Sequence, residues 1–438
     1  MKKLLIVYSL LIINCLHVLI LSSAKAQSLY FPPLSGSTWT TKSPTSLGWC
    51  QNRIDSLYDF AESRNTDALI ILVDGNIVLE KYFGSFTSSN YHVWNSAGKS
   101  LTGLLAGIAQ EKNFIDNNNS VSTYLGLGWS TAPLVKENLI TVNHLITMTS
   151  GLNDIPSSPT CTKEDSSTAC LEYLVDAGTR WAYHTGAYKK VQKVISQASG
   201  LSYNAFTNTH VGAPIGLVGT WINGTYFSTP RGAARFGLLA LNKGVWNNDT
   251  LLHDTTYFKE MTTTSQTYNL SYGNLWWLSG KASYMAPGLQ FVFSSNLMPN
   301  APSDMYCALG KDDQKIYVVP SKKMVVVRMG DSAYGSAAAF SPFDDELWDY
   351  INKLSCATSL KDEQGLSNST VFPNPFYDKI TLKTSLQVIN FTLETPLGES
   401  LWAGTTLEQN DFSYLPSGVY FLKVEFLDSN KIIKLVKK

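Results

Sequence analysis

Apolar residues recur at helical spacing in several segments of the chain. In residues 49–61, Ile54, Leu57 and Phe60 fall on one face, which predicts a helix. The apolar stretch at residues 101–108, which follows Ser96, predicts a second helix. The same criterion predicts further helices over residues 140–149, 188–199, 229–242 and 343–354.

Strands are predicted where short apolar runs are separated by turn residues. Residues 68–73 and 76–83 flank Asp74-Gly75, a dipeptide typical of two-residue hairpin turns. A second adjacent pair of strands is predicted at residues 315–320 and 324–329. The order of helix, hairpin, helical middle, strands and closing helix predicts an α+β fold (an α/β sandwich). We expect an antiparallel sheet flanked by helices, with an inserted helical subdomain.

The pattern changes after residue 356. Residues 357–369 are polar and are predicted to form a linker. Short alternating strands separated by Pro- and Gly-containing turns then predict a small all-β sandwich in residues 370–438. The predicted strands are residues 379–384, 388–394, 418–426 and 431–436.

The first 26 residues have the pattern of a secretory signal peptide. Lys2-Lys3 is the positive region, residues 4–21 are apolar, and Ala24-Lys25-Ala26 is a small-residue cleavage site. That site favours cleavage over the alternative of an uncleaved membrane anchor. No other segment is apolar enough to cross a bilayer, so the mature chain, with its main domain in residues 27–356, is expected to have no stable membrane span.

Charge and cysteine content narrow the functional classes. The chain has 34 Lys+Arg and 34 Asp+Glu among 438 residues, so no net field would attract nucleic acid. Of the 6 cysteines, Cys15 leaves with the leader. Cys161 and Cys170 are the expected disulfide, Cys50 and Cys356 could pair if their helices are antiparallel, and Cys307 would remain. No spacing matches a metal motif, and no metal or other cofactor is expected.

Ser96 and Lys99 lie three residues apart at the start of a predicted helix, so their side chains share one face. A lysine whose pKa is lowered by burial can take the proton of a serine hydroxyl and make it a nucleophile. Tyr183, in a turn before the helix at 188–199, could carry a second proton. Taken alone, each pattern is also typical of a helix start with a solvated lysine, or of a packed tyrosine.

These residues occur in an order that resembles a known superfamily. Ser96-x-x-Lys99-Ser100, Tyr183 in a Trp-x-Tyr-x-Thr setting, and Ala308-Leu309-Gly310 before residues 314–320 resemble the three motifs of serine β-lactamases and penicillin-recognising enzymes. The chain is most similar to serine hydrolases of the 6-aminohexanoate-dimer hydrolase type, over roughly residues 45–355. The resemblance implies a β-lactamase/transpeptidase-like fold and two-step acyl transfer.

The resemblance also implies roles for individual residues. Ser96 would accept the acyl group, and Lys99 would activate the Ser96 hydroxyl. Tyr183 would act as base in acylation and as acid toward the leaving group. Main-chain N–H groups of Ser96 and of a residue in the stretch 308–310 would form an oxyanion hole.

Two positions depart from the usual motifs. Ala308 stands where many relatives have the lysine of Lys-Thr-Gly, which removes a cation for a substrate carboxylate. Thr185 stands where the second motif often ends in asparagine. Together with Leu309 and Gly310, both are expected at the substrate cleft, and Trp276 is expected to wall it.

The C-terminal residues resemble a second family. Val371-Phe372-Pro373-Asn374-Pro375-Phe376, Leu415-Pro416-Ser417-Gly418-Val419-Tyr420 and the terminal Lys434-Leu435-Val436-Lys437-Lys438 are similar to a type A sorting domain of the type IX secretion system. The resemblance implies export to the cell surface or medium of a Bacteroidetes-type bacterium, through contact with that machinery. A carbohydrate-binding or adhesion module is the alternative.

Together these patterns predict a secreted serine hydrolase that cleaves an ester or amide bond of a small-molecule or peptide-like substrate. A D-alanyl-D-alanine carboxypeptidase, a β-lactamase, and an inactive peptidoglycan-binding protein on the same fold remain alternatives, because residue types alone do not fix the shape of the pocket.

Overall fold

The computed structural model describes the chain except for residues 1–28, 336–338, 357–368, 385, 397 and 427–429. The predicted signal peptide and all of the predicted linker except Ser369 therefore lie outside the described residues. By internal contacts the chain divides into two units, Met1–Leu354 and Ser355–Lys438. No helix among the described residues is long and apolar enough to cross a membrane.

The predicted hairpin is confirmed and forms one edge of the main sheet. Strand β1 (Thr66–Val73) pairs antiparallel with β2 (Asn76–Tyr82). Asp74 and Gly75 between them have φ values of 52° and 81°, as the two-residue turn requires. The sheet has six strands in the order β2-β1-β13-β12-β11-β8, with every described pairing antiparallel. Its other strands are β8 (Trp277–Leu278), β11 (Tyr306–Gly310), β12 (Gln314–Val319) and β13 (Met324–Gly330).

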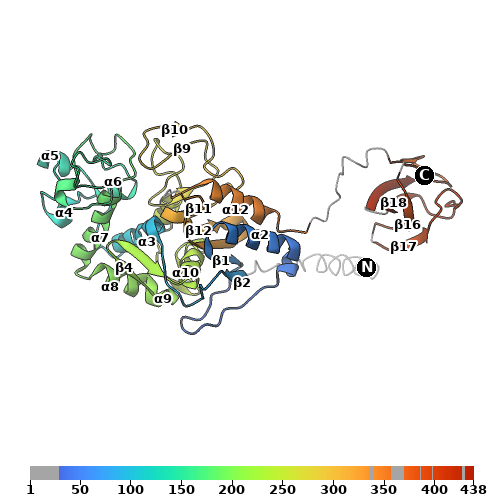
Figure 1. The fold of residues 1–438 in the computed structure, drawn as a ribbon, viewed down its shortest axis with the longest axis horizontal. Helices are drawn as coiled ribbons and strands as arrows, with labels where there is room; N and C mark the ends of the chain where they lie inside the picture. Colours follow the sequence, from blue (N-terminus) through green and yellow to red (C-terminus); the bar gives the residue numbers. More distant parts are fainter. Residues whose placement is uncertain (1–28, 336–338, 357–368, 385, 397, 427–429) are drawn as a thin grey trace, which may run out of the picture. The chain divides into compact units, whose positions relative to one another are not determined.

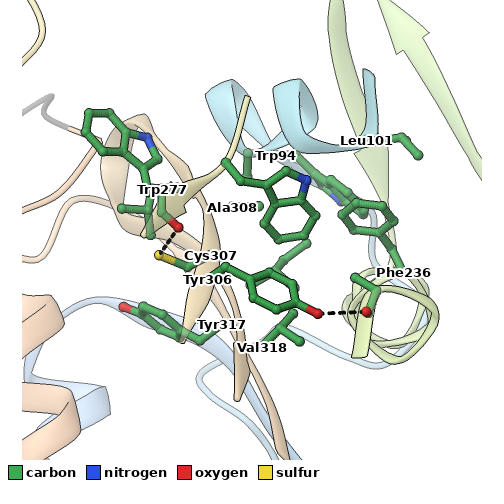
Figure 2. Packing of buried hydrophobic residues seen from close by; sticks show 14 of the residues in the cluster. Trp94, Leu101, Phe236, Trp277, Tyr306, Cys307, Ala308, Tyr317 and Val318 are labelled. Carbon is green, nitrogen blue, oxygen red and sulfur yellow. Dashed lines mark hydrogen bonds between the residues drawn. The ribbon is translucent and has the colours of Figure 1, made fainter. Parts of the chain in front are cut away.

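Helices cover both faces of this sheet, as predicted (Figure 1). Helix α10 (Pro230–Leu241) packs on β1, β12 and β13, and a Cβ at its Gly237 would come within 2.5 Å of Val325. On the opposite face, α2 (Gln51–Ser63) contacts β1 and packs against α12 (Pro342–Asn352), whose Trp348 meets Tyr317 of β12 edge to face. Figure 2 shows the core around β11, with Tyr306 directed toward α10 and Phe236.

A helical region is inserted between β2 and β8, again as predicted. Its longest helices are α3 (Gly98–Glu111) and α7 (Thr185–Ser199), which pack on each other. The helix predicted over residues 140–149 is wrong in length: α6 spans Val142–Ile146, because Met148 adopts φ 61° and a left-handed residue ends a helix. The shorter elements are α4 (Ser122–Leu125), α5 (Leu134–Glu137), α8 (Tyr203–Thr207), α9 (Ala213–Ile215), α11 (Thr255–Met261), β3 (His92–Val93), β4 (Gly219–Ile222), β5 (Thr225–Ser228), β6 (Val245–Trp246), β7 (Asp249–Thr250), β9 (Tyr284–Met285) and β10 (Val292–Phe293).

The second unit is all β and has its own core. A four-stranded antiparallel sheet in the order β17-β16-β18-β19 is accompanied by the pair β14-β15, and Phe376, Leu393, Leu422 and Leu435 are buried in its core. Two short strands, β14 and β17, were absent from the pattern-based prediction. The bounds are β14 (Thr370–Phe372), β15 (Thr381–Lys383), β16 (Val388–Glu394), β17 (Ser400–Gly404), β18 (Gly418–Phe426) and β19 (Asn430–Lys437).

The cysteines follow the expected scheme. Cys161 and Cys170 form a disulfide, and Cys307 is free and buried. Cys50 and Cys356 are both disulfide-bonded. The backbone N–H of Cys50 donates to the carbonyl of Leu354 at 3.0 Å, so the start of α2 and the end of α12 lie close together.

Candidate active site

Ser96 and Lys99 are brought together by the start of α3. A short 3-10 turn, Asn95–Ala97, leads directly into the helix, so the two side chains lie one turn apart on the same face. Nζ of Lys99 donates a hydrogen bond to Oγ of Ser96 at 2.9 Å. The residue before the serine, Asn95, has a φ of 49°, and its side-chain Nδ2 donates to the carbonyl of Lys311 at 2.9 Å. The serine therefore sits in a sharp turn that is held against the end of β11.

The surroundings of Lys99 disfavour a charged amine. Lys99 is only 3% exposed and forms no ion pair with a described residue. Its Nζ lies 5.0 Å from the ring centroid of Tyr183 and 4.7 Å from that of Tyr188. Burial lowers the pKa of Lys99 from 10.5 to about 7, opposed in part by the charge of Glu164. Near neutral pH a large share of this lysine is therefore an uncharged amine, which can accept a proton.

Tyr183 lies in the turn just before α7, next to the same lysine. Its ring stacks on Trp277 with centroids 5.8 Å apart and meets Tyr272 edge to face. Burial raises the pKa of Tyr183 well above its usual range, and a side-chain interaction with Ser96 offsets part of that rise. The phenol is therefore protonated near neutral pH. Its buried oxygen makes no well-formed hydrogen bond with any described residue, so the proton is not committed to a protein acceptor.

The third predicted stretch forms the end of β11, beside the serine turn. A Cβ at Gly310 would lie 2.3 Å from the carbonyl oxygen of Trp94 and 3.1 Å from the nitrogen of Ala97, so only glycine allows this approach. Ala308 is buried on the same side of β11 as Gly310, near Trp94 in Figure 2. Leu309 is also buried and alternates to the other side.

A buried arginine supports the turn that follows β11. Arg328, on β13, is fully buried and donates to the carbonyls of Asp312 and Asp313, both at 3.1 Å. It also donates to the carbonyls of Arg64 and Asn65 at 2.7 and 2.8 Å. Because the turn is fixed from behind, the backbone at Gly310 keeps its position against the serine turn.

Two further predicted cleft residues have different outcomes. Thr185 is the first residue of α7 and is half-buried, and its side chain makes no hydrogen bond with a described residue, so it is available to a ligand. Trp276, which was expected to wall the cleft, instead lies inside the core: it is fully buried and stacks on Phe236, with ring centroids 5.7 Å apart. Its neighbour Trp277 points to the opposite side and stacks on Tyr183.

Sequence reasoning missed the aromatic shell around the lysine and the phenol. Tyr188, Trp181 and Tyr272 are all buried and contact Lys99, Tyr183 or one another. Two of them carried a sequence signal: Trp181 is the tryptophan of the Trp-x-Tyr-x-Thr motif, and Tyr188 is the first residue of the predicted helix that follows Tyr183. Tyr272 and Trp277 are brought here by the tertiary fold, which no local pattern reveals.

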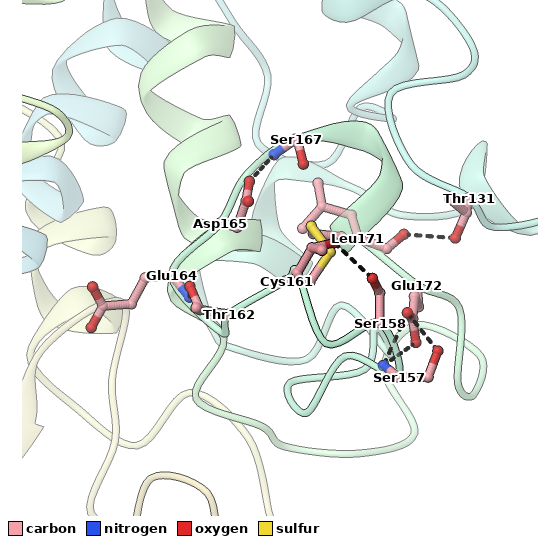
Figure 3. Close-up of a disulfide and its surroundings, with 12 residues drawn as sticks. Thr131, Ser157, Ser158, Cys161, Thr162, Glu164, Asp165, Ser167, Leu171 and Glu172 are labelled. Carbon is pink, nitrogen blue, oxygen red and sulfur yellow. Dashed lines mark hydrogen bonds between the residues drawn. A yellow bond between two sulfur atoms is a disulfide. The ribbon is translucent and has the colours of Figure 1, made fainter.

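A disulfide-bonded loop covers the start of α7 (Figure 3). Within the loop closed by Cys161 and Cys170, the carbonyl of Lys163 accepts from the N–H of Gly186 at 2.9 Å. The carbonyl of Glu164 accepts from Nζ of Lys189, also at 2.9 Å. The charges of Glu164, Lys189 and Lys163 all act on Lys99. The loop is thus part of the electrostatic environment of the site.

His184 lies beside Tyr183 but has a structural role. Its Nδ1 accepts from the N–H of Ala187 at 3.3 Å and so caps α7. Burial lowers the pKa of His184 to about 4, so the ring is neutral at ordinary pH. Among the described residues there is no group of three or more His, Cys, Asp or Glu side chains that could hold a metal ion.

Comparison with known proteins identifies two family domains. The beta-lactamase family profile matches residues 54–343, and the profile of a secretion system C-terminal sorting domain matches residues 370–438. A search of curated protein sequences finds no match.

Several solved structures share the fold of the first unit. A protein assigned as a 6-aminohexanoate-dimer hydrolase from Bacillus anthracis is 18% identical, with a TM-score of 0.56, over 75% of this chain and 91% of its own. A protein assigned as a beta-lactamase from Bacteroides dorei DSM 17855 is 15% identical, with a TM-score of 0.55, over 70% and 99%. A family VIII carboxylesterase is 13% identical, with a TM-score of 0.53, over 70% and 99%.

Proposed function

The chain belongs to the beta-lactamase family, and we propose that it is an exported hydrolase that forms an acyl-enzyme on Ser96 with ester or amide substrates. One observation carries the proposal: Nζ of Lys99 is 2.9 Å from Oγ of Ser96, and burial lowers the pKa of that lysine to about 7. A serine with a neutral amine at hydrogen-bond distance is an activated nucleophile.

The proton path follows from the two opposite pKa shifts. In acylation, Oγ of Ser96 bonds to the substrate carbonyl carbon while its proton passes to neutral Nζ of Lys99. The protonated phenol of Tyr183 then donates to the leaving alcohol or amine as the carbonyl–heteroatom bond breaks, and the proton on Lys99 restores the phenol. Water releases the acid by the reverse path. This assigns the base role in acylation to Lys99 rather than to Tyr183, because burial keeps the phenol protonated.

The developing oxyanion would be held by backbone N–H groups. Ser96 stands at the start of α3, where main-chain N–H groups and the positive end of the helix dipole face outward. The close approach at Gly310 brings the end of β11 to the same turn, so a second N–H can come from that strand. Two such donors are the usual arrangement for stabilising a tetrahedral intermediate.

The end of β11 lacks a cation that could bind a substrate carboxylate. Ala308 offers no charge, and Lys315 on the neighbouring strand does not replace it. Nζ of Lys315 lies 2.8 Å from Asp344 and 3.1 Å from Asp313, fully buried on the side of α12. A substrate carboxylate would therefore find no lysine on β11 or β12 to pair with. This favours neutral esters and amides over penicillins and over peptides that end in a carboxylate.

The second unit supplies the route out of the cell. Its match to a secretion system C-terminal sorting domain indicates export through the type IX system to the cell surface or the medium. Interaction with that machinery follows from the same domain. The hydrolase would therefore meet substrates that are outside the cell.

Covalent trapping tests the proposal directly. The purified protein is incubated with a fluorophosphonate probe, and the labelled peptide is identified by mass spectrometry. We expect one adduct, on Ser96, together with turnover of p-nitrophenyl esters. Absence of an adduct combined with absence of turnover would instead favour an inactive binding protein on this fold.

A further inference from the structure

A polar cavity lies at the far end of α3 from Ser96. Its volume is about 400 Å³, within the range of small-molecule sites. It is bounded by the end of α3, the following turn, the start of α6, and α11 with the segment after it. Its lining residues are Gln110, Asn117, Asn118, Asn143, Thr147, Tyr257, Glu260, Thr263, Thr264, Ser265 and Asn274.

Four asparagine carboxamides around this cavity have no hydrogen-bond partner among the described residues. Asn117 and Asn274 are each only 4% exposed, and both polar atoms of the Asn117 side chain are buried without a partner. The side chains of Asn143 and Asn118 also bond to no described residue. An unsatisfied buried carboxamide costs about 1–3 kcal/mol, so the two buried ones, Asn117 and Asn274, point to a ligand that satisfies them. Half-buried Asn143 and exposed Asn118 add further donors and acceptors at the same cavity.

The backbone holds these groups in place. The N–H of Asn117 donates to Oε1 of Gln110 at 3.0 Å, and its carbonyl accepts from the N–H of Asn143 at 2.7 Å. The hydroxyls of Thr147, Thr263 and Thr264 donate to main-chain carbonyls. The oxygen of Thr147 also accepts from the hydroxyl of Thr149 at 2.8 Å, whereas the oxygens of Thr263 and Thr264 accept from no described residue. The cavity therefore presents donors and acceptors side by side from fixed positions.

The chemistry of the lining selects the ligand. No aliphatic side chain, lysine, arginine or histidine lines the cavity, and Glu260 is its one carboxylate. An apolar ligand would find little apolar surface besides the ring of Tyr257, and an anionic ligand would meet Glu260 and no cation. A carboxamide, whose NH₂ donates and whose oxygen accepts, matches a pair of adjacent hydroxyls. We propose that this cavity is a binding site for a neutral saccharide, separate from the hydrolytic site.

The two sites are separated by the length of α3. Ser96 precedes the helix and Gln110 is in its last turn, which at 1.5 Å per residue places them roughly 20 Å apart along the axis. The saccharide site does not depend on the reactivity of Ser96. Loss of hydrolysis in a Ser96 variant should accordingly leave saccharide binding unchanged.

Isothermal titration calorimetry on the full chain tests the site. The probes are three neutral disaccharides (cellobiose, maltose and N,N′-diacetylchitobiose), one disaccharide containing glucuronic acid, and the amide of trialanine. We expect at least one neutral disaccharide to bind with a Kd below about 5 mM, as is reached with a few hydrogen bonds. Asn143→Ala should weaken that binding about fivefold or more, and Asn274→Ala similarly.

Asn52→Ala is the matched control. Asn52 is exposed on α2 and does not line the cavity, so this variant should bind the sugar as tightly as the unaltered chain does. Because Asn143 is only half-buried, its variant should fold even where Asn274→Ala does not, and retained ester hydrolysis verifies this. The proposal is overturned if no neutral disaccharide binds, if Asn143→Ala binds it equally well, or if the acidic disaccharide or the peptide binds as tightly.

Discussion

Lys99 Nζ and Ser96 Oγ are 2.9 Å apart, in a pocket where the amine meets the faces of two tyrosine rings rather than a carboxylate. This relationship decides the chemistry, because a lysine paired with an acid would stay protonated and could not accept the serine proton. Burial is the main cause of the lowered pKa of Lys99, and the start of α3 fixes the distance between Nζ and Oγ.

Ser96→Ala should abolish hydrolysis of p-nitrophenyl butyrate, with kcat/KM reduced by about 10³-fold or more because the acyl acceptor is gone. Stopped-flow absorbance gives the rate and circular dichroism the fold. Ser100→Ala is the control on the same helix: its hydroxyl donates to the carbonyl of Leu275 at 2.7 Å, so it should cost stability but retain most activity. Equal activity in both variants would remove Ser96 from the mechanism.

The pH dependence of kcat/KM should report Lys99. Activity should be low in acid, rise as the pH passes about 7, and level off above, because only the neutral amine accepts a proton. Lys99→Met should lose this limb together with nearly all activity. A profile flat from pH 5 to 9 would contradict the assignment.

The same shift predicts how stability varies with pH. The pKa of Lys99 is about 7 when folded and 10.5 in the unfolded reference, so between these values the unfolded chain binds more protons. The penalty for burying the charge of Lys99 should therefore shrink as the pH rises from 7 toward 10.5, and the free energy of unfolding should increase. Urea titrations at pH 7 and 9 should show a larger increase for the natural chain than for Lys99→Met.

Tyr183→Phe keeps the ring that packs on Trp277 and removes only the proton donor. Amides and alkyl esters need a protonated leaving group, so their kcat should fall about 10²–10³-fold. A p-nitrophenyl ester, whose leaving group departs as a stable anion, should lose much less. Tyr188→Phe, on the other ring beside Lys99, should affect both substrate types alike. A uniform loss in Tyr183→Phe would argue against a proton donor.

Gly310→Ala should push β11 away from the serine turn, since the added methyl would lie 2.3 Å from the carbonyl of Trp94. We expect kcat/KM to fall about tenfold or more and stability to drop by ~1–3 kcal/mol, as in other overpacked sites. Gly418→Ala, where the nearest atom is 3.9 Å from the added carbon, is the control for the substitution itself. Unchanged kinetics in Gly310→Ala would mean that the end of β11 takes no part in catalysis.

Removing the Cys161–Cys170 disulfide should alter the pH profile. Replacing both cysteines by serine frees the loop that carries Lys163 and Glu164, at a cost of ~2.5 kcal/mol in loop entropy. Water would then reach Lys99, its pKa would move back toward 10.5, and the midpoint of the kcat/KM profile would shift upward from about 7. Cys307→Ala, which leaves the disulfides intact, should keep the original midpoint.

Local patterns predicted most elements but not their ends. The turn at Asp74-Gly75 fixed the hairpin because two adjacent left-handed residues permit little else. The helix at 140–149 was predicted too long, since apolar spacing continues past Ile146 while Met148 turns left-handed. That conformation depends on packing rather than on periodicity.

In the site, spacing alone placed Ser96 beside Lys99, because i and i+3 on a helix meet whatever surrounds them. Trp276 and Trp277 show the opposite case. Trp276 comes directly before β8 and Trp277 is the first residue of that strand, and only the fold decides that Trp277 faces Tyr183 while Trp276 enters the core.

The amino-acid sequence by itself determined which groups can react, the order of the elements and the presence of a sorting domain, because these depend on residue type and short-range spacing. The tertiary structure decided the pKa of Lys99, the protonated state of Tyr183 and the unpaired carboxamides beside α3. Those properties depend on burial and on neighbours brought from distant segments, so no local pattern could reveal them.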